Sequence, residues 1–168
     1  CLLAGALGVI IKTDNILIGG GLIMEKDISK SIEIYKNQLI QGDIRRAYIL
    51  LIRYIGELKA KFPEQYSTGN ISLGYLDYTY FPFFNAYLRQ HKLRFGIVLN
   101  HMKMQFELWL MGQNATVQKK YWELLRNTDW NKDVKAMPQY SVLEVCLESN
   151  IDFSNKNESY YIYVIFKF

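Results

Sequence analysis

Apolar residues in the first part of the chain recur three or four positions apart, which is the spacing of the buried stripe of an α-helix. The pattern begins at Asp27 and stops at Gly42. Asp43 suits the N-cap of a second helix, and the same spacing continues from there to Pro63. The sequence therefore predicts an N-terminal helical hairpin.

Extended segments follow the two helices. ISLGYLDYTYFPFF, residues 71–84, is rich in aromatic and β-branched side chains, which favour strands. Pro82 cannot donate a hydrogen bond to a neighbouring strand, so we expect it to end this strand at or near a sheet edge. Segments 92–99 and 104–111 predict two further strands joined by a tight turn. Together these segments predict a three-stranded antiparallel meander.

The register of the last two strands depends on where their turn is centred. A turn centred on His101 and Met102 places Phe95 opposite Leu108, and a shift of one residue would send every side chain to the wrong face. One face is then wholly apolar, formed by Leu99 with Met104, Ile97 with Phe106, Phe95 with Leu108 and Leu93 with Leu110. The other face is mixed, formed by Val98 with Gln105, Gly96 with Glu107 and Arg94 with Trp109.

Two helices are predicted after the strands. Asn114 offers an N-cap to the segment ATVQKKYWELLRN, which has one apolar side. Ser141 and Glu144 form a capping box that predicts the start of a short final helix. The expected order is α-α-β-β-β-α-α, an α+β fold.

Charged residues are scarce at both ends of the chain. Residues 1–23 and 159–168 together hold three of them, Lys12, Asp14 and Lys167. We interpret residues 1–23, which lack an initiating Met and a basic n-region, as a non-native or upstream leader. Residues 24–158 are then a single α+β domain. Residues 159–168 form an atypical apolar tail with the high β-propensity of an aggregation-prone strand.

The remaining composition excludes several classes of protein. A net charge of +4 permits nucleic acid as a partner without indicating it. Cys1 and Cys146 lie far apart, with no second Cys or His at ligand spacing, so neither a zinc site nor a disulfide framework is indicated. The sequence contains no nucleophile elbow and no phosphate-cradling glycine loop, and we expect no cofactor. No apolar run is long enough to span a membrane, and a reducing cytoplasm fits best.

The mixed face of the strand pair is the best candidate for a functional surface. Arg94 and Trp109 can form a cation–π contact there, with Glu107 and Gln105 on the same face. Gly96 leaves a gap in front of the carboxylate, as happens where a ligand or another chain segment comes close. A helix or loop packed over this face would fill the same gap, and this is the commoner arrangement. We expect a non-catalytic module that binds a protein or a small molecule through these four side chains.

Two alternatives remain open at this point. Asp77 and Glu107 lie on strands of an α-β-β-β-α order that is similar to the core of metal-dependent nucleases, where two carboxylates hold Mg²⁺. The lysine expected two residues after the second carboxylate is Trp109 here, so only a divergent metal-dependent hydrolase fits. A nucleic-acid-binding domain would instead use basic helix faces, formed by Arg45, Arg46, Arg53, Lys119 and Lys120.

Several stretches of the chain resemble one family. They are IEIYKNQLIQGDIRRAYILLIRYI, LGYLDYTYFPF, KLRFGIVLNHMKMQFELWLMGQN and VQKKYWELLRNTDWNK. Over about residues 27–153 the chain resembles a family of small bacterial domains of unknown function. The resemblance implies one folded cytoplasmic domain and assigns no catalytic residue. Members of that family continue in a charged helical C-terminus, from which SYYIYVIFKF departs.

Overall fold

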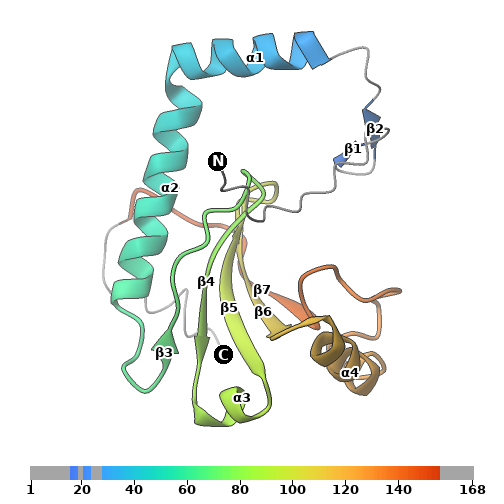
Figure 1. The fold of residues 1–168 in the computed structure, drawn as a ribbon. Helices are drawn as coiled ribbons and strands as arrows, with labels where there is room; N and C mark the ends of the chain where they lie inside the picture. The colour runs from blue at the N-terminus through green and yellow to red at the C-terminus, as the bar shows by residue number, and fades with distance from the viewer. Residues whose placement is uncertain (1–15, 19–20, 24–27, 156–168) are drawn as a thin grey trace, which may run out of the picture. The chain divides into compact units, whose positions relative to one another are not determined.

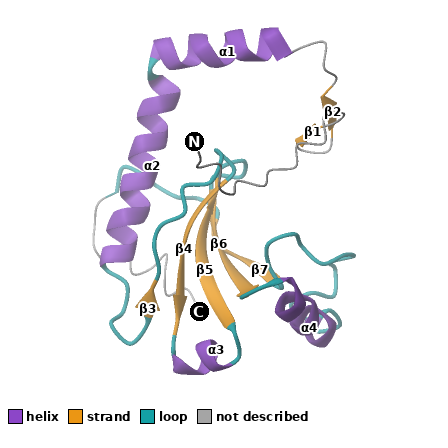
Figure 2. Ribbon diagram, viewed as in Figure 1, coloured by secondary structure: helices purple, strands orange, loops and turns teal. Residues whose placement is uncertain are grey.

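The computed structural model describes residues 16–18, 21–23 and 28–155, so most of the expected leader and the whole apolar tail lie outside the described residues. Residues up to Arg46 and residues from Ala47 onward form two compact units. Figure 2 shows their helices and strands. No helix among the described residues is both long enough and apolar enough to cross a bilayer.

The first unit contains a short strand pair and a helix. Strands β1 (Ile16–Ile18) and β2 (Gly21–Ile23) pair antiparallel. Helix α1 (Ile28–Gln41) forms where the apolar spacing predicts it. It ends at Gly42, which has a φ of 85° that glycine adopts without strain.

The second unit is built on one antiparallel sheet of five strands. Helix α2 (Asp43–Ala60) leads into it, and the strand order is β3-β4-β5-β6-β7 (Figure 1). The strands are β3 (Ser67–Thr68), β4 (Tyr78–Phe84), β5 (Leu93–Asn100), β6 (Gln105–Gly112) and β7 (Leu143–Glu148). Two shorter helices interrupt them, α3 (Ala86–Gln90) and α4 (Ala115–Leu125). The fold is therefore α+β as expected, but the meander has five strands where three were predicted.

The prediction that Pro82 ends the first of these strands is wrong. Strand β4 continues through Pro82 to Phe84, because the proline carbonyl remains available and accepts a hydrogen bond from Gly69 N at 2.8 Å. On its other side Pro82 pairs with Gly96 of β5. Only the two-residue strand β3 lies outside β4, so the expected position near a sheet edge is confirmed.

The predicted register of β5 and β6 is wrong by two residues. Phe95 pairs with Leu110 and not with Leu108, and Arg94 pairs with Met111 and not with Trp109. The pairing runs up to Asn100 with Gln105, so the turn occupies His101–Met104 and includes Met104 at a φ of 49°. An even shift keeps every side chain on its predicted face, and the apolar and mixed faces are as expected.

The predicted final helix is a strand. Residues 143–148 pair antiparallel with β6, and their side chains alternate, with Leu143 and Leu147 buried and Glu144 and Cys146 exposed. Ser141 Oγ does donate to Glu144 Oε1 at 2.6 Å, but this pair precedes a strand and caps no helix. The run LEVCLE has a period of two, and pairing with β6 satisfies its backbone groups.

Helices of the second unit pack on one face of the sheet, which we call the core face. Tyr54, Ile55 and Leu58 of α2 pack there with residues of β4, β5, β6 and β7. Trp122 of α4 and Leu88 of α3 form a second cluster with the opposite ends of β5 and β6. Asn114 caps α4 as predicted, because its side chain accepts a hydrogen bond from Val117 N at 3.0 Å. These two clusters hold the sheet rigidly enough to position side chains on its other face.

Candidate functional site

The face of the sheet opposite the core face, which we call the second face, carries the residues singled out in the sequence. Alternation along the strands places there Tyr78 and Tyr80 of β4, Arg94, Gly96 and Val98 of β5, Glu107, Trp109 and Met111 of β6, and Glu144 of β7. Val98, Trp109 and Met111 form a small buried cluster against Tyr78 and Tyr80. Among the described residues, no helix contributes to this cluster.

Gly96 provides space for a neighbouring side chain. A Cβ atom at this position would lie 2.5 Å from the terminal methyl group of Met111. Gly96 also lies directly opposite Trp109, two residues along β6 from Glu107, the partner predicted for it. The gap is therefore filled by Met111, and it does not open in front of the Glu107 carboxylate.

Glu107 is a buried carboxylate surrounded by donors. Its Oε2 accepts from Trp109 Nε1 at 2.8 Å, and its Oε1 accepts from Asn100 Nδ2 at 3.1 Å and from the Gln105 amide. Lys103 Nζ completes the set with an ion pair at 3.4 Å, and its own side chain is largely exposed. A buried charge is tolerated when it is paired and hydrogen-bonded, as this one is. Glu107 thus anchors the Trp109 indole, and Gln105 contributes by its hydrogen bond to the Glu107 carboxylate.

A cavity of about 270 Å³ lies on the second face above these residues. We call it the tyrosine cavity, because four tyrosines line it, Tyr75, Tyr78, Tyr80 and Tyr140. The other lining residues are Ser72, Gly74, Asp77, Arg94, Trp109 and Met111. The Tyr78 ring meets the Trp109 indole edge to face at 4.8 Å between centroids. Tyr75 and Tyr140 are both exposed. The cavity therefore has a fixed aromatic floor and a solvent-facing rim.

Arg94 connects this cavity to a second one. Its Nε is buried and has no hydrogen-bond partner among the described residues. A buried donor without a partner costs about 1–3 kcal/mol, and a movement of the side chain that brought Nε to an acceptor would recover that energy. Arg94 also lines the neighbouring cavity.

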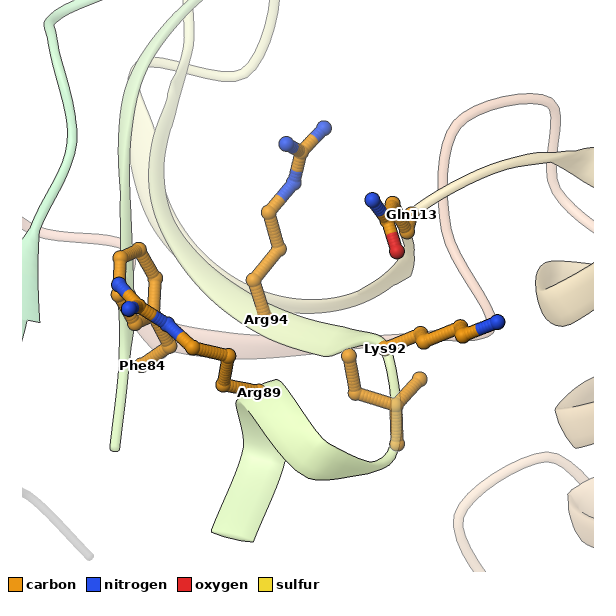
Figure 3. A pocket seen from close by; sticks show the side chains of 6 residues that line it. Phe84, Arg89, Lys92, Arg94 and Gln113 are labelled. Carbon is orange, nitrogen blue, oxygen red and sulfur yellow. The ribbon is translucent and has the colours of Figure 1, made fainter. Parts of the chain in front are cut away.

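The second cavity, which we call the basic pocket, has a volume of about 180 Å³. Its lining residues are Phe84, Arg89, Lys92, Leu93, Arg94 and Gln113, three of them cationic and none acidic (Figure 3). The Arg89 guanidinium lies over the Phe84 ring at 4.6 Å, a cation–π contact. Figure 3 shows Arg94 extending away from β5, toward the side on which Gln113 lies, while Lys92 extends in another direction. Within the described part of the chain, none of the three cations forms a salt bridge.

Helix α3 and its flanking residues build the wall of the basic pocket. Asn85 caps this helix by accepting a hydrogen bond from Leu88 N at 2.9 Å. Lys92 follows the helix with a φ of 57°, a left-handed conformation that is uncommon for a residue other than glycine. The Lys92 carbonyl accepts from Gln113 N at 2.9 Å, which joins the helix end to the end of β6.

Asp77 and His101 lie at the rim of the sheet beside the tyrosine cavity. Partial burial opposes ionisation of Asp77, but hydrogen bonds from Tyr75 N and Tyr78 N hold its pKa below the usual value. Burial lowers the pKa of His101, an effect partly offset by Asp77. Thr79 Oγ1 donates its only proton to Leu73 O at 3.0 Å. His101 Nε2 lies 2.8 Å from Thr79 Oγ1, so in this pair the histidine donates and the threonine oxygen accepts. This network fixes the neutral His101 as its Nε2–H tautomer.

The pKa of Tyr78, one of the tyrosines that line the cavity, is raised by burial and by nearby carboxylates. Burial raises the pKa of Tyr78, and the negative charges of Glu144 and Glu107 raise it further. Partial desolvation raises the pKa of Glu144, and the nearby Glu107 adds to that rise. The hydroxyl of Tyr78 therefore remains protonated at neutral pH and is available as a donor.

The structure places the other sequence-derived candidates as follows. Asp77 and Glu107 each accept from their own set of donors, and no three His, Cys, Asp or Glu side chains of the described residues could together hold a metal ion. Arg53 on α2 and Lys119 and Lys120 on α4 are exposed. Arg45 and Arg46 belong to the other compact unit. The tyrosine cavity, in contrast, brings together Arg94, Trp109 and Asp77.

Sequence reasoning missed Arg89 and Lys92. The run RQHKLR, residues 89–94, holds three cations in six positions, and Asn85 before it is a good N-cap. These features indicate a short helix that ends beside Arg94. A five-residue helix is too short to show an apolar period, which is why the segment has no clear pattern.

Comparison with known proteins adds a family to this description. No curated protein and no solved structure matches the chain. One family model does match, over residues 28–161, and it describes a domain of unknown function, DUF7000. The match spans α1, α2, the five-stranded sheet and both cavities. The chain therefore belongs to the DUF7000 family of domains of unknown function.

Proposed function

We propose that this domain is a non-catalytic binding module that takes a small anionic ligand with an aromatic or other planar ring on the second face of its sheet. The observation that carries the proposal is Arg94, which lines the tyrosine cavity and whose buried Nε has no hydrogen-bond partner among the described residues. A carboxylate or another oxyanion bound there would accept hydrogen bonds from the Arg94 guanidinium.

The walls of the tyrosine cavity suit the ring of such a ligand. Aromatic side chains favour offset or edge-to-face contacts with another ring, and they lose little rotamer freedom when they make them. Tyr78 is already held by Trp109, and Tyr75 and Tyr140 can close over a bound ring from the exposed rim. Small-molecule sites usually combine this kind of apolar wall with a few placed polar groups.

The arrangement of the carboxylates favours binding over catalysis. A general base needs a lone pair directed at the substrate. The Glu107 oxygens accept from Asn100, Gln105, Lys103 and Trp109, and Asp77 accepts from two backbone amides. Glu107 thus accepts on both of its oxygens and supports the floor of the cavity, whereas the two bonds to Asp77 both go to Oδ1 and hold the loop before β4.

Benzoate and its uncharged analogue benzyl alcohol test this proposal. We expect benzoate to bind the full chain with a Kd of about 1 mM, as measured by calorimetry or by amide chemical shifts. Benzyl alcohol should bind at least tenfold more weakly, because it brings no anionic acceptor to Arg94. Arg94→Gln should weaken benzoate binding tenfold or more, a loss of about 1.4 kcal/mol.

The matched control is Arg53→Gln, which removes an exposed arginine of α2 that lines neither cavity. It should leave benzoate binding unchanged. Equal binding of benzoate by Arg94→Gln and by the unaltered protein would refute the proposal. Trp109 is unsuitable for this test, because only 4% of it is exposed and its removal would disturb the sheet itself.

A further inference from the structure

We infer that the anionic group of the ligand is a phosphate ester seated in the basic pocket, so that the ligand belongs to the class of aromatic phosphate esters, of which a mononucleotide is an example. The inference rests on the proposed function and extends it, because it assigns the second cavity to the other end of the same ligand.

The two cavities are adjacent because they share Arg94. Strand β4 also runs past both of them: Tyr80 lines the tyrosine cavity and Phe84 lines the basic pocket. Four residues of strand separate these two side chains, which corresponds to about 13 Å. One ligand of moderate length can therefore place a ring in the first cavity and a charged group in the second.

The charge of the basic pocket suits a phosphate better than a carboxylate. A carboxylate carries one negative charge, which Arg94 alone would balance. Arg89 and Lys92 add two further positive charges, and no acidic residue lines the pocket. A phosphate monoester carries a charge of about −1.5 to −2 at neutral pH and offers three acceptor oxygens, so it can bond to several cations at once.

The three cations are arranged so that they can close on a ligand. Figure 3 shows them spread around the pocket, with Arg89 on the Phe84 side and Lys92 pointing away from it. Arg89 and Lys92 are exposed, so their long side chains can turn toward a bound anion at a modest cost in rotamer entropy. Arg94 is only partly exposed, so its side chain has less freedom to turn than those of Arg89 and Lys92.

Lys92 offers a test that separates binding from stability. Its left-handed conformation is strained for lysine, whereas glycine adopts it readily. Lys92→Gly therefore removes a cation from the pocket without weakening the fold. A decrease in affinity in this variant cannot be attributed to unfolding.

Calorimetry with adenosine 5′-monophosphate, adenosine and inorganic phosphate on the full chain tests the inference. We expect the monophosphate to bind at least tenfold more tightly than either fragment. Lys92→Gly and Arg89→Gln should each weaken binding of the monophosphate three- to tenfold and leave adenosine binding unchanged. Lys119→Gln, which removes an exposed lysine of α4 outside both cavities, is the control and should change neither.

The outcomes distinguish this inference from the proposed function. Equal affinity for adenosine and its monophosphate would overturn the phosphate assignment, while benzoate binding that depends on Arg94 would still support the proposed function. Loss of that benzoate binding as well would overturn both. Affinity for oligothymidylate that rises steadily with its length would show that the surface takes a nucleic acid strand, and would overturn the assignment to a mononucleotide-sized ligand.

Discussion

Glu107 supports the floor of the tyrosine cavity without lining the cavity itself. It is 2% exposed and accepts hydrogen bonds on both oxygens, from the Trp109 indole on one side and from Asn100 and Gln105 on the other. An ionised carboxylate is the only common side chain of this size that can accept from all of these donors at once. Its charge is therefore a structural requirement of the cavity floor.

Glu107→Gln is expected to destabilise the protein by about 2–3 kcal/mol. The amide of glutamine carries two N–H donors, so at least one of them would face the indole or amide donors that Glu107 now satisfies. Urea unfolding monitored by circular dichroism measures the loss as a lower midpoint with an unchanged slope.

Lys103→Gln is the control for this substitution. It removes the exposed partner of the same ion pair and should cost less than about 1 kcal/mol, because exposed pairs contribute little. If both variants lost the same stability, the ion pair and not the set of neutral donors would dominate the environment of Glu107.

At the scale of secondary-structure elements, the β5–β6 hairpin shows what the sequence could predict. Alternation of apolar and polar residues identified both strands and sorted Arg94, Glu107 and Trp109 onto one face. The same alternation has a period of two, so it cannot detect a register error of two residues. The error arose at the turn, where Met104 adopts a left-handed conformation that the expected tight turn did not contain.

The other missed elements depend on contacts that are distant in the sequence. Residues 143–148 show the alternation of a strand, but the spacing of Ser141 and Glu144 predicted a helix. The strand forms because it pairs with β6, a contact that the local sequence does not indicate. Strand β3 has two residues and α3 has five, too few to form a pattern. The basic pocket was missed for the same reason, because only α3 brings Arg89 beside Arg94.

Met104→Gly should stabilise the hairpin by about 0.5–1 kcal/mol. Its φ of 49° is strained for methionine and free of strain for glycine, and the gain is partly offset by the greater flexibility of glycine in the unfolded chain. Thermal unfolding measures the change as a rise in Tm.

Met102→Gly provides the comparison within the same turn. Met102 is 80% exposed and is not among the described residues with positive φ, so glycine there brings only the entropic loss and should lower the Tm slightly. An equal fall in Tm for both variants would show that Met104 carries no strain.

At the scale of the whole second unit, the two faces of the sheet differ in what packs on them, and our proposal gives them separate roles. The core face holds the large buried clusters with α2, α3 and α4. The second face carries the small cluster around Trp109 and the tyrosine cavity, and the basic pocket lies beside α3 at the end of the sheet. Stability and binding should therefore respond to different substitutions.

Leu58→Ala and Arg94→Gln test this separation together. Leu58 is fully buried between α2 and the sheet, so its truncation should cost about 2–5 kcal/mol. The protein that remains folded should bind benzoate with unchanged affinity, whereas Arg94→Gln should lose affinity with little change in unfolding midpoint. Weaker benzoate binding by folded Leu58→Ala would show that the two faces are coupled.

The order of strands in the sheet is also their order along the chain, and this has a consequence for how the protein reaches its native state. Each new strand can join one that is already in place, and among the pairings of this sheet the longest connection is residues 113–142, which contains α4 and joins β6 to β7. The β5–β6 hairpin, with its short turn, can form within microseconds and provide an edge for β4 and then for β7. Because neighbouring strands of the sheet are also consecutive along the chain, the sheet can assemble strand by strand as the protein leaves the ribosome.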